Sequence, residues 1–181
     1  MPFDADAYPK LAADVQGRIA EIIEAAVTVE GEGEAPDVVL AKVLTQDPVN
    51  LDEARWAASL LSDADKDEND DKRIHAWVVT FAGAEPEKDT GVHDLQTKLT
   101  YQVQVFYSHD YGEGGGSEAR LRDEIMRVQW ALASDPDFTG IGKIGRHYNL
   151  HMRVALGRMG ESVIHRGRGE LVVGLHPLHT G

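Results

Sequence analysis

The sequence predicts an α+β protein with a mostly antiparallel β-sheet of two hairpins and flanking α-helices. Four segments alternate apolar and polar side chains with the period of a strand, whereas two longer segments repeat apolar residues at helical spacing. Hydrophobic residues make up 42% and charged residues 27% of the chain, which is typical of a globular fold. We therefore expect residues 1–181 to fold as one domain.

The first expected element is an amphipathic helix over residues 8–27. A proline in its first turn is acceptable because that position has no helical hydrogen bond to lose. A helix of this size is about 30 Å long, which is enough to cover a sheet. Its apolar residues recur at intervals of three and four: Leu11, Val15, Ile19, Ile22, Ile23 and Ala26.

Two shorter elements follow the first helix. Residues 38–44 are apolar and β-branched between two prolines, which favours a buried strand, although a helix remains possible. A short helix is expected over 50–61, because Asn50 and Glu53 fit a capping box. Trp56 lies on the face that would pack against the core.

Two segments are expected to form exposed loops. Residues 62–72 are mostly charged and contain too few apolar side chains to bury. Asp63, Asp65 and Asp67 alternate as at the start of a calcium-binding loop, but the glycine and the terminal glutamate of that motif are missing, so a solvated acidic loop is favoured. Residues 83–96 are polar and are expected to form a long loop.

The two hairpins come from the alternating segments. Residues 74–82 and 99–107 should pair with each other, with Trp77 and Tyr101 on apolar faces. Residues 149–156 and 163–175 should form the second hairpin after a turn at Met159-Gly160.

A second long helix is expected between the hairpins, over residues 118–132. Ser117 can cap its start, and Asp135-Pro136 ends it. One face carries the apolar residues Leu121, Ile125, Val128 and Leu132.

No pattern points to a catalytic, cofactor or metal site. The chain has no cysteine, which excludes a thiol nucleophile and a Cys-ligated metal. The glycine run 112–116 lacks the lysine of a phosphate-binding loop, and the serines lack a nucleophile-elbow pattern. His147 and His151 fall in a strand pattern, where their spacing favours surface histidines over a zinc site. We therefore expect no enzyme activity.

The chain is also expected to lie outside membranes and to be soluble. Residues 1–10 carry two aspartates instead of the basic and apolar regions of a secretory signal. There is no run of eighteen apolar residues that would span a bilayer. Arg166-Gly167-Arg168-Gly169 is similar to segments that bind single-stranded nucleic acid, but the alternation instead places both arginines on an exposed strand face.

Charge is distributed unevenly along the chain. The formal net charge is −13, which argues against ordinary nucleic-acid binding. Residues 1–72 hold 18 acidic and 6 basic residues, whereas residues 138–181 hold 2 acidic and 6 basic residues. Such a polarity suits head-to-tail association of copies, and the alternative is a solvated acidic surface. The candidate subunit-interface residues are Arg153, Arg158, Arg166 and Arg168 on the basic side and Asp63, Asp65 and Asp67 on the acidic side.

The order of elements resembles the tail-terminator (tail-completion) proteins of long-tailed bacteriophages. The resemblance runs over residues 74–79, 99–107 and 118–132 and is completed by the last hairpin. It implies a structural virion protein, made in the host cytoplasm, that forms a hexameric ring at the head-tail (neck) junction. The implied partners are the tail tube protein and a neck or head-completion protein.

In such a ring DNA would cross an acidic channel without specific binding, because like charges repel the phosphates. The alternatives are a head-completion or other neck connector protein, or an acidic α+β adaptor that binds a cellular protein.

Overall fold

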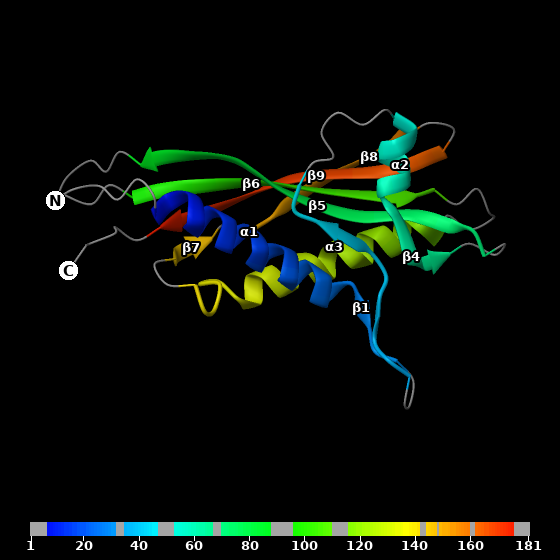
Figure 1. Ribbon diagram of the computed structural model, residues 1–181, viewed down its shortest axis with the longest axis horizontal. Helices are drawn as coiled ribbons and strands as arrows, with labels where there is room; N and C mark the ends of the chain where they lie inside the picture. Colours follow the sequence, from blue (N-terminus) through cyan, green and yellow to red (C-terminus); the bar gives the residue numbers. More distant parts are fainter. Residues whose placement is uncertain are drawn as a thin grey trace.

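The computed structural model describes residues 7–31, 35–46, 53–66, 70–87, 96–109, 116–141, 144–147, 149–159 and 162–175, and they form an α+β fold (Figure 1). The helices are α1 (Ala7–Ala26), α2 (Glu53–Ser59) and α3 (Gly116–Ser134). The strands are β1 (Thr28–Val29), β2 (Val38–Val39), β3 (Lys42–Leu44), β4 (Leu61–Lys66), β5 (Lys72–Glu87), β6 (Gln96–Ser108), β7 (Ile144–His147), β8 (His151–Met159) and β9 (Ser162–Leu175).

The main sheet is built from the two expected hairpins. β5 pairs with β6 and β8 pairs with β9, and the hairpins join where β6 pairs with β9. β3 and β4 lie along the other edge of β5, and β7 follows β8 along the edge of β9. In the described part of the chain every pairing is antiparallel except that of β3 with β5. The prediction of a mostly antiparallel sheet is therefore confirmed.

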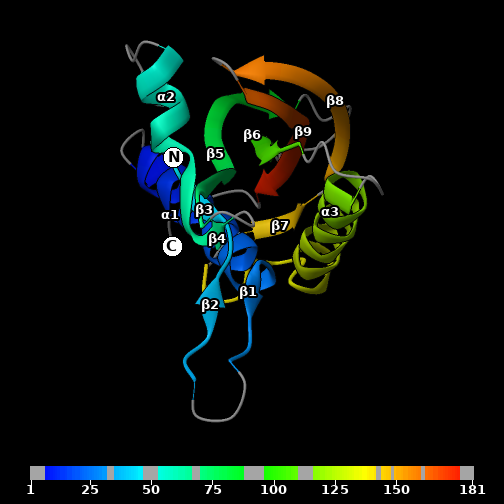
Figure 2. The ribbon, with the colours of Figure 1, turned by 90° about the vertical axis from the view of Figure 1, so that its right-hand side faces the viewer.

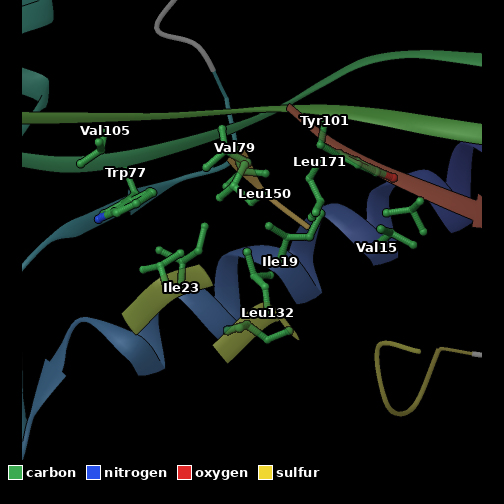
Figure 3. Packing of buried hydrophobic residues seen from close by; sticks show 14 of the residues in the cluster. Val15, Ile19, Ile23, Trp77, Val79, Tyr101, Val105, Leu132, Leu150 and Leu171 are labelled. Carbon is green, nitrogen blue, oxygen red and sulfur yellow. The ribbon is translucent and has the colours of Figure 1, made fainter. Parts of the chain in front are cut away.

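Helices α1 and α3 pack side by side against one face of this sheet. Figure 3 shows Ile19 and Ile23 of α1 facing Trp77 and Val79 of β5 across the core. Tyr101 of β6 is also buried there, and its hydroxyl donates to the carbonyl of Ala12 on α1 at 2.9 Å. The apolar stripes predicted for both long helices form this core.

Helix α2 covers part of the opposite face. Trp56 of α2 packs edge-on against Phe106 of β6, with ring centroids 5.2 Å apart. A second cluster of buried side chains surrounds this contact: Leu60, Ile74, Ala76, Val78, Phe106, Met159 and Ile164. β5 is consequently buried on both faces over Ala76–Val79, whereas Phe81 beyond the helix is exposed.

Glycines on the inner face of β9 allow atoms of the neighbouring strands β6 and β8 to pack close to its backbone. A Cβ on Gly167 would come within 2.5 Å of Val105, and one on Gly169 would meet the carbonyl oxygen of His151 and come within 2.8 Å of Met152. The Arg-Gly repeat thus serves packing, because its glycines face inward and Arg166 and Arg168 are exposed. The predicted alternation of exposed and buried residues on this strand is confirmed.

Three of the expected element boundaries are wrong. Residues 62–66 of the expected acidic loop belong to strand β4, which begins at Leu61, and residues 83–87 of the expected long loop continue β5. An edge strand can carry charged side chains because its outer side stays in water, so composition alone does not reveal it. Residues 38–44 are two strands, β2 and β3, and β2 is exposed.

Some further expectations concern the ends of elements. Helix α2 begins at Glu53, and Asn50 lies outside the described residues. Helix α3 begins at Gly116, so Ser117 is inside the helix, where its hydroxyl meets histidines. β7 was not predicted. Residues 67–69, 88–95 and 110–115, which complete the expected loops and most of the glycine run, also lie outside the described part.

Candidate functional site

A groove runs between helix α3 and strand β8. Figure 2 shows the two elements on the same side of the molecule, with β8 arching above α3. The groove has a volume of about 510 Å³. Two of its lining residues are His109, which follows β6, and His165 of β9. The others come from α3 and β8: Glu118, Leu121, Arg122, Ile125, Met126, Gln129, Met152, Val154, Ala155 and Leu156.

The groove exists because the apolar face of β8 is covered over only part of its length. The sequence alternation predicted that Leu150, Met152, Val154 and Leu156 share one face, and the pairing with β9 confirms it for the last three. Leu150 is buried and Met152 is half-buried, but Val154 is 45% exposed and Leu156 61% exposed. The last two side chains thus form an apolar wall with no covering layer from the described residues.

The opposite wall is also apolar and exposed. Met126 of α3 is 53% exposed and Trp130, one turn later, is 74% exposed. A second cavity of about 340 Å³ lies beside Trp130 and is lined by Gln129 as well, so the two hollows adjoin. Large exposed side chains gathered in one place mark surfaces that other molecules cover. This groove is the best candidate for a functional site.

One end of the groove contains a cluster of two histidines and a serine. Nε2 of His165 lies 3.0 Å from Nδ1 of His109 and 3.1 Å from the hydroxyl of Ser117. Ser117 and His165 are buried, so the hydroxyl is not accessible to a substrate as a nucleophile. The cluster joins the first turn of α3 to β9 and the end of β6 and thereby fixes one end of the groove. No sequence pattern predicted that these three residues meet.

A buried ion pair holds the middle of α3 on the sheet. His75 of β5 donates from Nδ1 to Asp65 at 2.8 Å and from Nε2 to Glu124 of α3 at 2.9 Å. The indole N–H of Trp77 donates to the same glutamate at 2.7 Å, and the Tyr107 ring packs perpendicular to the imidazole. α3 is therefore tied to two strands by charged groups as well as by its apolar face.

The protonation of His75 follows from its neighbours. Burial lowers the pKa of His75, but the hydrogen bonds and negative charges of Asp65 and Glu124 outweigh it and raise the pKa to about 9. The imidazole is therefore charged at neutral pH, and Glu124 has a cationic partner. A buried carboxylate without such a partner would be strongly destabilising.

The structure brings three of the four candidate arginines together. Arg153 lies opposite Arg168 across the β8–β9 pairing, and Arg166 is on the same face of the ribbon. This is the α2 side of the sheet, because Arg166 pairs with Phe106, contacts its ring face at 5.4 Å and donates to Gln104. Arg158 falls on the other face of β8, on the same side as the groove.

The acidic candidates do not form a matching cluster. Asp63 is exposed on β4 and pairs with Lys72. Asp65 is engaged with the buried His75, and Asp67 lies outside the described residues. Asp63 and Asp65, whose spacing imitated a calcium loop, lie in the irregular part of β4 between its pairings with β5 at Leu61 and Lys66.

Nothing in the described part of the chain points to a metal or a membrane-spanning segment. No three histidine, aspartate or glutamate side chains there are placed to hold a metal ion. None of the described helices is both long enough and apolar enough to cross a bilayer. No family model and no curated protein matches the chain.

Proposed function

We propose that this chain is a structural virion protein of a tailed bacteriophage, a tail terminator that forms a hexameric ring at the neck, caps the tail tube and lets DNA pass. The observation that carries the proposal is the exposed apolar groove between α3 and β8. Met126, Trp130 and Leu156 form a surface suited to contact with protein. Its walls are side chains of two rigid elements, as a permanent subunit contact requires.

The charge distribution supports the same proposal. The acidic first part of the chain and the basic last part favour an orientation in which unlike regions of neighbouring copies meet. A net charge of −13 in every copy gives the ring a negative field, which keeps DNA from adhering while it moves through. The partners in this proposal are the tail tube protein and a neck protein.

Catalysis is not part of the proposal. The hydroxyl of Ser117 is buried. His75 and Glu124 form a buried ion pair with each other inside the fold. The exposed part of the groove is lined mainly by apolar side chains, which suit binding better than proton transfer.

A second candidate function uses the same surface. The chain as an acidic adaptor would bind a segment of a cellular protein in the α3–β8 groove, with Trp130 as an anchor. The two candidates differ in self-association, because an adaptor has no need to form rings. A head-completion or other neck protein is a variant of the first candidate.

Two tests address the phage proposal. A tail-tube or tape-measure gene beside this coding sequence would support it, and metabolic neighbours would contradict it. The direct test mixes the purified chain with tubes assembled from the neighbouring tube protein and images them by electron microscopy. We expect rings at one end of each tube, and rings that never bind a tube end would contradict the role as a terminator.

A further inference from the structure

Strands β1 and β2 form a separate arm that projects from the body. Figure 2 shows this two-stranded ribbon leaving the lower end of the molecule beyond α1. Thr28 pairs with Val39 and Val29 with Val38. The three valines are exposed, with Val38 at 40%. An isolated two-stranded ribbon is marginally stable in water, so an arm with apolar sides gains stability by contact with another surface.

Hydrogen bonds hold the two sides of the arm together both at its base and beyond the β1–β2 pairing. The N–H of Leu40 donates to the carbonyl of Val27 at 3.1 Å, and the N–H of Gly31 donates to Asp37 at 3.1 Å. A side chain at Gly31 would collide with the backbone of Ala35, so glycine is required for the two sides to approach this closely. The exposed valines are thus presented in a fixed arrangement.

The arm of one copy points away from that copy's own groove. In Figure 2 the arm points downward, whereas β8 lies at the top of the molecule and α3 to one side. The arm and the groove are both apolar and exposed, yet they lie on different parts of one chain. Their partners are therefore to be sought on other molecules.

We propose that the arm of one copy binds in the α3–β8 groove of the next copy. Val29, Val38 and Val39 would cover Met126, Val154 and Leu156, which removes both apolar surfaces from water. This inference rests on the proposed self-assembly and names the contact that produces it.

The charges of the two surfaces are complementary. Residues 30–37 contain four acidic and no basic residues, including the exposed Glu30 and Asp37. The groove lining contains one basic residue, Arg122, and one acidic residue, Glu118, and the exposed Arg158 follows its β8 wall. Residues 116–175, which carry the groove, hold 9 basic and 7 acidic residues in a chain of net charge −13. An acidic arm therefore binds the basic part of its neighbour.

The backbone of β8 offers a further contact. Within the described residues β8 pairs with β9 alone, so its other edge has free N–H and carbonyl groups beside the groove. An extended arm can add to such an edge through main-chain hydrogen bonds. Because arm and groove are different surfaces, the contact is head-to-tail and closes into a ring when the rotation per copy divides a full turn.

Disulfide trapping tests where the arm binds, and the absence of native cysteine makes it unambiguous. A Val38→Cys variant is mixed with a Leu156→Cys variant under mild oxidation. We expect a cross-linked dimer of one copy of each, and no such product when Ala82→Cys, at an exposed position on β5, replaces Leu156→Cys. Equal yields from both mixtures would overturn the assignment.

Charge variants test the same contact in solution. We expect Val38→Asp and Leu156→Asp each to weaken self-association by about tenfold or more, while Ala82→Asp leaves it unchanged. Neither changed side chain is buried, and far-ultraviolet circular dichroism would verify that the variants fold. An equimolar mixture of Val38→Asp and Leu156→Asp retains one intact arm and one intact groove and should form one-to-one dimers without larger species.

The outcomes separate this contact from the wider proposal. Rings of native size in the Val38→Asp variant would overturn the arm contact but leave ring formation standing. Native chain that stays monomeric, with no trapped dimer from the cysteine variants, would overturn both.

Discussion

His75 is a buried cation that lies between carboxylates of two different elements. Its pKa of about 9 in the folded protein exceeds the ordinary value of 6.5. The charged form therefore contributes stability that is fully present below pH 6.5 and is lost as the pH rises through 9. The position of α3, and with it one wall of the groove, depends on this charge.

Stability should accordingly fall between pH 6.5 and pH 9. We expect the free energy of unfolding to decrease on the order of 3 kcal/mol over this window, measured by urea denaturation at several pH values. A His75→Gln variant should lose most of this slope, whereas His151→Gln, at an exposed position on β8, should keep it. If the native protein were equally stable at pH 6.5 and pH 9, His75 would not carry a stabilising positive charge at neutral pH.

The glycines of β9 give a second prediction at this scale. Gly169→Ala should destabilise the fold by about 1–3 kcal/mol, because the new methyl group would overlap His151 and Met152. Gly157→Ala in the same hairpin meets no atom within 4 Å and is the matched control, with an expected change of about 0.5 kcal/mol or less. Thermal unfolding of both variants compares them. Equal effects would mean that β8 does not pack this closely against Gly169.

At the scale of elements, the docking of α2 depends on Trp56. Its ring packs on Phe106, but within the described structure its indole nitrogen is buried without a hydrogen-bond partner. Trp56→Phe should therefore be neutral to within about 1 kcal/mol, because it keeps an aromatic ring beside Phe106 and removes an unsatisfied donor. Trp56→Ala should cost about 3–5 kcal/mol in chemical denaturation. A loss as large for phenylalanine as for alanine would show that the N–H has a partner.

Periodicity predicted the elements that bury one face. α1, α3 and the two hairpins include most of their expected ranges, because burial of a face leaves a pattern in the sequence, although β5 continues to Glu87. β4 and β7 lie at sheet edges and are short, and an edge strand can form from charged residues by backbone pairing alone. β2 is apolar for a different reason, since its valines are exposed on the arm.

The candidate site was only partly predictable. The alternation of Val154 and Leu156 was visible, but whether another layer covers that face depends on the path of α3, which no local pattern records. Met126 and Trp130 fall outside the predicted core stripe of α3. Large apolar residues on an otherwise polar helix face could have indicated the groove from the sequence. The His75 network joins residues far apart in the chain, so spacing could not reveal it.

At the scale of the whole molecule, charge should govern how copies meet. Arg166 and Arg168 lie on the exposed ribbon face, so each contributes about 0–1 kcal/mol to a contact but adds to the long-range field. Changing both to glutamate should slow assembly, followed by light scattering, while leaving the monomer folded. High salt should slow the native chain in the same way, and unchanged rates in both experiments would exclude electrostatic steering.

In the proposed function, copies of this chain form closed rings. The most direct measurement is the mass distribution of the native chain over a range of concentrations, combined with negative-stain electron microscopy of the largest species. We predict particles with a central opening and a mass six times that of the 19.8 kDa chain. A single 19.8 kDa species at every concentration, or open filaments without closure, would contradict the claim.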